Sequence, residues 1–177
     1  SYHKFPYRIE YAKGFMGLKD DVLTLGLVGY SGSQPIYVSA EVQQPLSAEP
    51  YGWIKAEGEK IQLDEKLFAA IPNPSRNVIC SLDPRGSFNG SLVVWRDRPG
   101  EPAHRRLVVT LNRCWIQYSK FPYPLSISDG ILEMQDNGWL FRGLKAANDT
   151  GAITCEVGHV AIGFTSRLFS SALVLIG

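Results

Sequence analysis

An internal repeat is the feature of this sequence that most restricts its fold. The segment Tyr2–Tyr7 (YHKFPY) returns as Tyr118–Tyr123 (YSKFPY) with a single difference, at an offset of 118 − 2 = 116 residues. Self-similarity at a fixed period is the sequence signature of a repeat architecture, in which each repeat forms one structural unit. The sequence therefore predicts one repeat unit over residues 1–117 and the first half of a second copy over residues 118–177.

The register of the repeat continues beyond the six matched residues. At the same offset Gly14 falls on Gly130, and with one inserted residue Gly26-Leu27 falls on Gly143-Leu144. A period of this length in a chain of 177 residues predicts a fragment of a longer repeat protein. The apolar run at 172–177 fits that expectation, although a natural C-terminal strand is the alternative.

Hydrophobic residues alternate with polar ones over most of the chain, which predicts antiparallel strands. In 22–28, Leu23, Leu25 and Leu27 share one face, and in 36–42 every second residue is apolar. Further strands are predicted over 91–96 and 107–118, joined by a loop rich in proline and glycine. The Asn137-Gly138 dipeptide between two apolar runs predicts a tight hairpin. The fold class expected is mainly β, as an antiparallel sheet, groove or sandwich.

One segment departs from the two-residue period and predicts a short helix over about residues 64–71. Leu67, Phe68 and Ile71 have helical spacing, Asp64 is placed to cap the first turn, and Pro72 follows the last residue. Two turns of helix are not stable alone. We therefore expect this helix to pack its apolar side against the sheet.

Composition and charge exclude several classes of function. With 18 Lys and Arg against 17 Asp and Glu, the net charge is +1, which disfavours nucleic acid as a partner. No apolar run reaches the length of a membrane-spanning helix. The three cysteines, Cys80, Cys114 and Cys155, form no C-x-x-C pair, so no metal site and no cofactor is predicted.

Catalytic residues are also scarce in this sequence. His3, His104 and His159 show no metal-binding spacing, and Cys114 lies in an apolar strand, where a buried thiol is usually structural. We therefore predict a protein that is not an enzyme. A hydrolase remains the less favoured alternative, and it would require the histidines to gather with a carboxylate in one pocket.

Aromatic residues lie within predicted strands whose two faces both read as apolar, notably 91–95 and 139–141. Such a strand must bury both faces or line an apolar groove. This pattern is compatible with two structures, a sandwich core with an interface to the next repeat and a lipid-binding groove.

A series of short motifs resembles the AsmA-like envelope proteins of bacteria. These motifs are 61–72 (IQLDEKLFAAIP), 82–86 (LDPRG), 121–125 (FPYPL) with Asp129-Gly130, and 148–151 (NDTG). The resemblance covers roughly residues 5–160. In that family, repeating β modules form a long groove implicated in carrying phospholipid between membranes.

The resemblance implies a non-enzymatic protein of the periplasm or cell envelope of a bacterium, whose parent chain is anchored in a membrane. Its implied partners are phospholipid acyl chains and neighbouring repeats of the same parent chain. The residues that it implies for lipid contact are Leu23, Leu25, Leu27, Val93, Trp95, Trp139 and Phe141. The alternatives are an adhesion or carbohydrate-binding β-sandwich module and, third, a jelly-roll coat or capsid protein.

Overall fold

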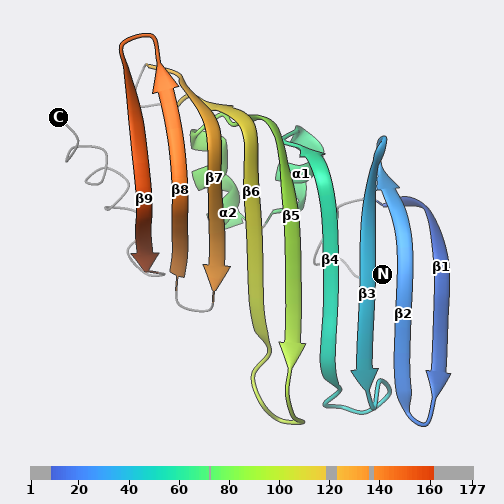
Figure 1. The fold of residues 1–177 in the computed structure, drawn as a ribbon. Coiled ribbons are helices and arrows are strands. Elements are labelled where there is room, and N and C mark those ends of the chain that lie inside the picture. The colour runs from blue at the N-terminus through green and yellow to red at the C-terminus, as the bar shows by residue number, and fades with distance from the viewer. Residues whose placement is uncertain (1–8, 72, 119–122, 136–137, 162–177) are drawn as a thin grey trace.

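The computed structural model describes residues 9–71, 73–118, 123–135 and 138–161, which form nine strands and two short helices. All nine strands belong to one open antiparallel sheet, in which they follow one another in chain order (Figure 1). The mainly β prediction is confirmed, and the sheet is single, not two sheets packed as a sandwich. The strands are β1 Glu10–Lys19, β2 Val22–Ser31, β3 Gln34–Gln43, β4 Tyr51–Gln62, β5 Arg85–Arg96, β6 His104–Ile116, β7 Leu125–Gln135, β8 Gly138–Asn148 and β9 Gly151–Ala161.

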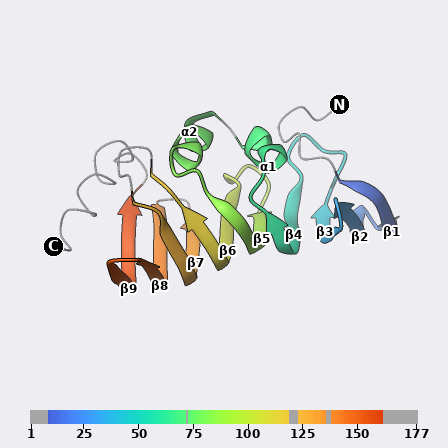
Figure 2. The same cartoon turned by 90° about the horizontal axis from the view of Figure 1, so that it is seen from above.

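Both helices lie in the connection between β4 and β5, on one side of the sheet (Figure 2). The predicted helix is α1, Glu65–Ala70, and the Asp64 side chain caps it by accepting a hydrogen bond from Leu67 N at 2.9 Å. The second helix, α2, spans Asn73–Ser81 and was not predicted. Proline normally ends a helix, but Pro74 is the second residue of α2, within the first turn, where no N–H is needed.

The hairpin connections agree with the sequence at the points that the structure describes. Gln135 pairs directly with Gly138, so the hairpin between β7 and β8 is as predicted, but Gly138 is the first residue of β8 and not part of the turn, and Asn137 lies outside the described residues. The loop rich in proline and glycine ends where β6 begins, at His104. Gly32 has a φ of +62°, and it joins β2 to β3 in a tight turn that favours glycine.

Strands β1 to β3 and β7 to β9 have matching bounds at the offset of the sequence repeat. Lys19 and Gln135, the last residues of β1 and β7, are 116 residues apart, as are Val22 and Gly138, the first residues of β2 and β8. In both copies the same glycine, Gly14 or Gly130, has a φ near +155°. The end of β1 and the start of β2 thus recur in β7 and β8 at the offset of the sequence match.

A small core lies at the end of the strands where the helical connection is attached. Its buried members are Cys114, Ile127 and Ala146, and the half-buried Leu63, which precedes the N-cap residue of α1, packs against them. Two backbone hydrogen bonds fasten the helical connection to the sheet, from Leu63 N to Gly86 O at 3.0 Å and from Gln117 N to Leu82 O at 2.8 Å. In Figure 1 the helices lie behind the upper halves of the central strands.

Candidate functional site: the apolar face of the sheet

The strand register brings apolar residues of successive strands into straight rows on one face of the sheet. Residues that pair directly across strands point to the same side. Two neighbouring rows, each crossing eight strands, contain only glycine and apolar residues. They are Gly14, Leu27, Val38, Ala56, Leu92, Leu107, Met134 and Trp139, and then Gly29, Ile36, Gly58, Gly90, Val109, Leu132, Phe141 and Gly158.

We call the side of the sheet that carries these rows the apolar face, and the opposite side the polar face. Adjacent strands are about 4.8 Å apart, so a row across eight strands extends about 34 Å. A continuous uncharged strip of that length is the kind of surface that marks a ligand-binding groove. The apolar face is therefore the first candidate for a binding surface.

Only one end of the apolar face is covered by the rest of the described chain. The core around Cys114 lies at the end where α1 and α2 are attached, and Leu111, on the apolar face, packs against it. Toward the other end, Ile54 and Val94 pair across β4 and β5 and keep 48% and 37% of their surface exposed. The helices thus close one end of the strands, whereas the other end remains accessible.

Two arginines of the described chain lie on the apolar face, near the end of the strands away from the helices. Arg105 pairs with Val94, and Arg96 pairs with Gly52, so both arginines lie at this end. The Arg96 Nη1 atom donates a hydrogen bond to Pro50 O at 3.0 Å. Two guanidinium groups therefore border the accessible end of the apolar rows.

The structure separates the seven residues predicted to contact lipid into two groups. Leu23, Leu25 and Leu27 lie on the apolar face at β2, and Trp139 and Phe141 lie on the same face at β8. Val93 and Trp95 lie on the polar face, because Val93 pairs with Lys55 and Arg106. On β5 the residues that belong to the apolar face are Leu92 and Val94.

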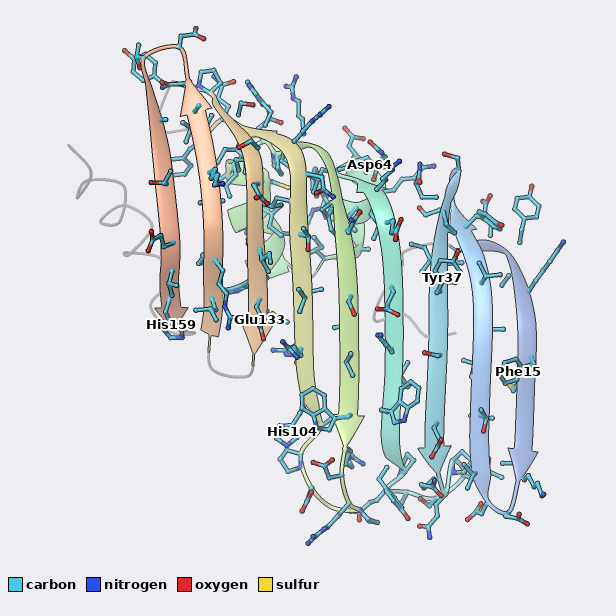
Figure 3. All side chains as sticks on the ribbon, in the orientation of Figure 1. Phe15, Tyr37, Asp64, His104, Glu133 and His159 are labelled. Atoms are coloured by element: carbon cyan, nitrogen blue, oxygen red, sulfur yellow. The ribbon has the colours of Figure 1, made fainter. Side chains whose placement is uncertain are left out.

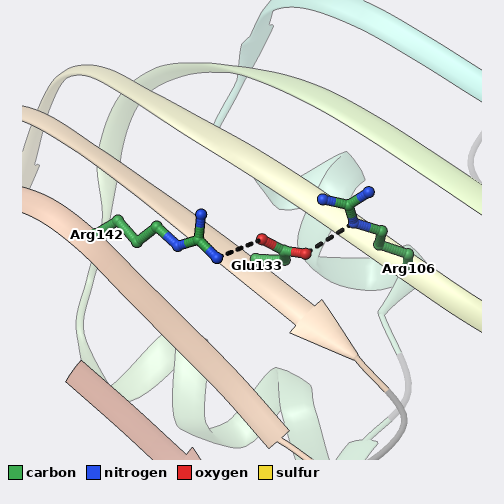
Figure 4. Close-up of polar contacts among 3 residues, drawn as sticks. All are labelled: Arg106, Glu133 and Arg142. Carbon is green, nitrogen blue, oxygen red and sulfur yellow. Dashed lines mark hydrogen bonds and ion pairs between the residues drawn. The ribbon is translucent and has the colours of Figure 1, made fainter. Parts of the chain in front are cut away.

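An ion-pair cluster lies on the polar face, opposite the helices (Figure 4). The Arg106 Nε atom donates a hydrogen bond to Glu133 Oε1 at 2.7 Å, and Arg142 Nη2 lies 3.8 Å from Glu133 Oε2. Glu133 itself is only 4% exposed, although both arginine side chains are more than half exposed. The cluster connects β6, β7 and β8, and the sequence analysis missed it because its three members come from three strands.

Aromatic side chains form a second polar-face feature. Trp53 pairs with Trp95, and Trp95 pairs with His104, so the three residues lie in one row across β4, β5 and β6. The Trp95 and His104 rings are stacked, with centroids 5.4 Å apart and planes at 29°. Nearby on this face, Glu57 pairs with Lys55 at 2.8 Å and accepts a hydrogen bond from Ser91 Oγ at 3.3 Å.

The candidate residues for catalysis do not come together among the residues that the structure describes. His104 begins β6 and His159 lies in β9, with β7 and β8 between them (Figure 3), and His3 is outside the described residues. No group of three metal-ligating side chains is found in the described part of the chain. Within that same part, neither helix is long and apolar enough to cross a membrane.

The three cysteines are free thiols in very different surroundings. Cys114 is 2% exposed, and its Sγ donates a hydrogen bond to Ser87 O at 3.1 Å. Burial raises the pKa of the Cys114 thiol. Cys80, in α2, is exposed. The sequence prediction of a structural thiol at Cys114 agrees with this position in the core.

Comparisons of this chain with protein-family models, with curated proteins and with solved structures find no match.

Proposed function

We propose that the apolar face binds the acyl chains of phospholipids and that the protein is a non-enzymatic module of a lipid-transporting groove in the bacterial cell envelope. The observation that supports this most directly is the pair of uncharged rows crossing eight strands each. An acyl chain makes no hydrogen bonds, so its binding requires a surface without unpaired polar groups. Backbone polar groups inside a sheet are already paired along the strands.

The geometry of the open sheet suits a ligand that slides. The rows run across the strands, so a chain lying along them meets similar apolar side chains at each strand and has no preferred stopping point. The helices and the core at Cys114 would limit the surface at one end of the strands. Arg96 and Arg105, at the accessible end, would favour an anionic headgroup there. Neighbouring repeats of the same parent chain would lengthen this surface.

The test uses adjacent residues of β5 that lie on opposite faces. Val94→Asp introduces a carboxylate on the apolar face at a partly exposed site, whereas Val93→Asp introduces the same group on the polar face, next to Lys55 and Arg106. Gently purified protein is extracted and its lipid measured by native mass spectrometry. We expect Val94→Asp to lose co-purifying phospholipid at least tenfold relative to Val93→Asp. Equal retention by the two variants, or no lipid in the unmodified protein, would contradict the proposal.

A second candidate function is supported by the aromatic row on the polar face. Trp53, Trp95 and His104 lie in one row across β4, β5 and β6, and an adhesion or carbohydrate-binding module would use such a row. Aromatic rings present apolar surface together with polar edges, which suits a sugar ring. Binding on a glycan array that is lost in Trp53→Ala and kept in Val94→Asp would favour this candidate over lipid binding.

A further inference from the structure

The first strand of the sheet exposes residues whose counterparts in the second copy of the repeat are covered. Met16 is 74% exposed, whereas Leu132, at the same place in β7, is partly buried. Tyr11 is 78% exposed, whereas Ile127 is 5% exposed. On this side of β7 the sheet continues with β6, whereas β1 has no neighbour there among the described residues; Ile127 is in addition covered by the core that includes Leu63.

The equivalence of β1 and β7 extends to their backbone geometry. Gly14 and Gly130 have φ values of +155° and +156°, and a Cβ atom at either would collide with the next strand, at Leu27 or at Leu144. Leu27 and Leu144 are themselves counterparts in the repeat. The two strands therefore match from this glycine onward, over 14–19 and 130–135, whereas Tyr11 has a φ of +53° that its counterpart Ile127 does not share.

We infer that the outer edge of β1 is a binding site for an antiparallel strand with the chemistry of β6. Transferring the observed register of β6 and β7 by 116 residues predicts the pairing. In the structure, Met134, Leu132 and Gly130 of β7 pair with Leu107, Val109 and Leu111 of β6. The residues of the added strand that correspond to these three would therefore lie opposite Leu18, Met16 and Gly14. The added strand would bring apolar residues at every second position to the apolar face and extend its rows by one strand.

The side chains of β1 also restrict which strand can pair with its outer edge. Leu18 and Met16 are both exposed on the apolar face, so the partner needs apolar residues two positions apart opposite them. On the polar face, Gly17 stands where β7 has Glu133, so an arginine such as Arg106 gains no carboxylate partner there. The strand that fits β1 therefore resembles β6 in its apolar residues and does not require its basic one.

The experiment appends a copy of residues 104–117 directly before Tyr2 of the full chain, with serine in place of the copied Cys114. This junction reproduces the connection between β6 and the second copy of the repeated segment, because Gln117 is followed by Tyr118 in the native sequence. In hydrogen exchange we expect the β1 amides that do not bond to β2 to exchange at least tenfold more slowly than in the unextended chain. The matched control carries Asp at the copied Leu107, Val109 and Leu111, and it should give no protection.

The register is tested by cross-linking in the same extended chain. Met16→Cys combined with Val109→Cys in the appended copy should form a disulfide under mild oxidation, whereas Met16→Cys with Val108→Cys in the copy should not, because its side chain points to the other face. Unchanged exchange at β1, equal protection by the Asp control, or equal cross-linking of both pairs would overturn the inference. Protection of β1 already present in the unextended chain, together with a dimeric mass, would assign the edge to a second copy instead. Lipid retention is a separate measurement, so the edge and the proposed lipid site can each fail alone.

Discussion

Arg106 and Glu133 are joined by a 2.7 Å hydrogen bond across β6 and β7, in which the Glu133 side chain is almost completely buried while more than half of the Arg106 side chain is exposed. The polar face of this sheet therefore contains one carboxylate that depends on its partners. The arginines can return to water if the pair is broken, but the carboxylate cannot without local rearrangement.

This asymmetry predicts unequal effects of substitution within the cluster. Glu133→Ala should lower the free energy of unfolding by about 1–2 kcal/mol, since it removes a charged hydrogen bond but leaves its arginine partners free to hydrate. Arg106→Ala should cost more than Arg142→Ala, because the first removes the short hydrogen bond and the second only a contact at 3.8 Å. Urea unfolding of the three variants gives the comparison, and an Arg142→Ala variant less stable than Arg106→Ala would contradict it.

Two glycines of β1 should respond differently to the same substitution. A Cβ at Gly14 would collide with Leu27 and the carbonyl of Gly26, and its φ of +155° is unfavourable for other residues, whereas a Cβ at Gly17 has no atom within 4 Å. Gly14→Ala should therefore lower the stability of β1 by more than about 1 kcal/mol, and Gly17→Ala should leave it nearly unchanged. Hydrogen exchange of the β1 and β2 amides measures both, and similar exchange in the two variants would show that this close contact does not matter.

Burial of Cys114 predicts a dependence of stability on alkaline pH. The folded protein holds this thiol protonated to higher pH than the unfolded chain does, because burial raises the Cys114 pKa above its ordinary value of 9.0. The resulting stabilisation is complete below the unfolded pKa, so it should decrease as pH rises above about 9. Since lysines and tyrosines also titrate there, the measured quantity is the difference in unfolding free energy between the unmodified protein and Cys114→Ser at pH 8 and pH 10. A difference that does not change with pH would show that burial does not raise the pKa of Cys114.

Asp64 should control the helical connection through its cap. Asp64→Ala removes the hydrogen bond to Leu67 N and should cost about 1 kcal/mol, whereas Asp64→Asn retains an N-capping side chain and should cost much less. Because Leu63 packs against the core around Cys114, loss of the cap should also speed alkylation of that thiol. The two variants are compared by the alkylation rate of Cys114, with exposed Cys80 as the internal reference. Equal alkylation rates of Cys114 in the two variants would show that the Asp64 cap does not protect the core.

The strands and their faces were predictable because the two-residue period of a half-buried strand is a local property. Leu23, Leu25 and Leu27 share a face in any register, and the cap at Asp64 depends only on residues three positions apart. Where a strand is apolar on both sides, the two-residue period does not show which residues belong to which face of the sheet. For this reason Val93 and Trp95 could not be distinguished from Leu92 and Val94 without the pairing of β5 to β4.

The features that escaped the sequence depend on residues far apart in the chain. The Glu133 cluster requires the register of three strands, and the aromatic row requires Trp53, 42 residues before Trp95, to lie directly opposite it. Helix α2 was hidden by Pro74, whose effect on a helix depends on where the helix begins. A single open sheet also could not be distinguished from a sandwich, because both have strands with one apolar face.

The order of the strands has a kinetic consequence. Each described strand pairs only with the strands that precede and follow it in the chain, so the contacts of the sheet join successive strands. Sheets with such local contacts close small loops at each step, which favours fast folding for a β protein. Stability is then distributed along the sheet by nearest-neighbour interactions, as in solenoid proteins. The fully exposed β1 would separate first and the strands beside the helical connection last, so unfolding should be graded from the edge of the sheet inward.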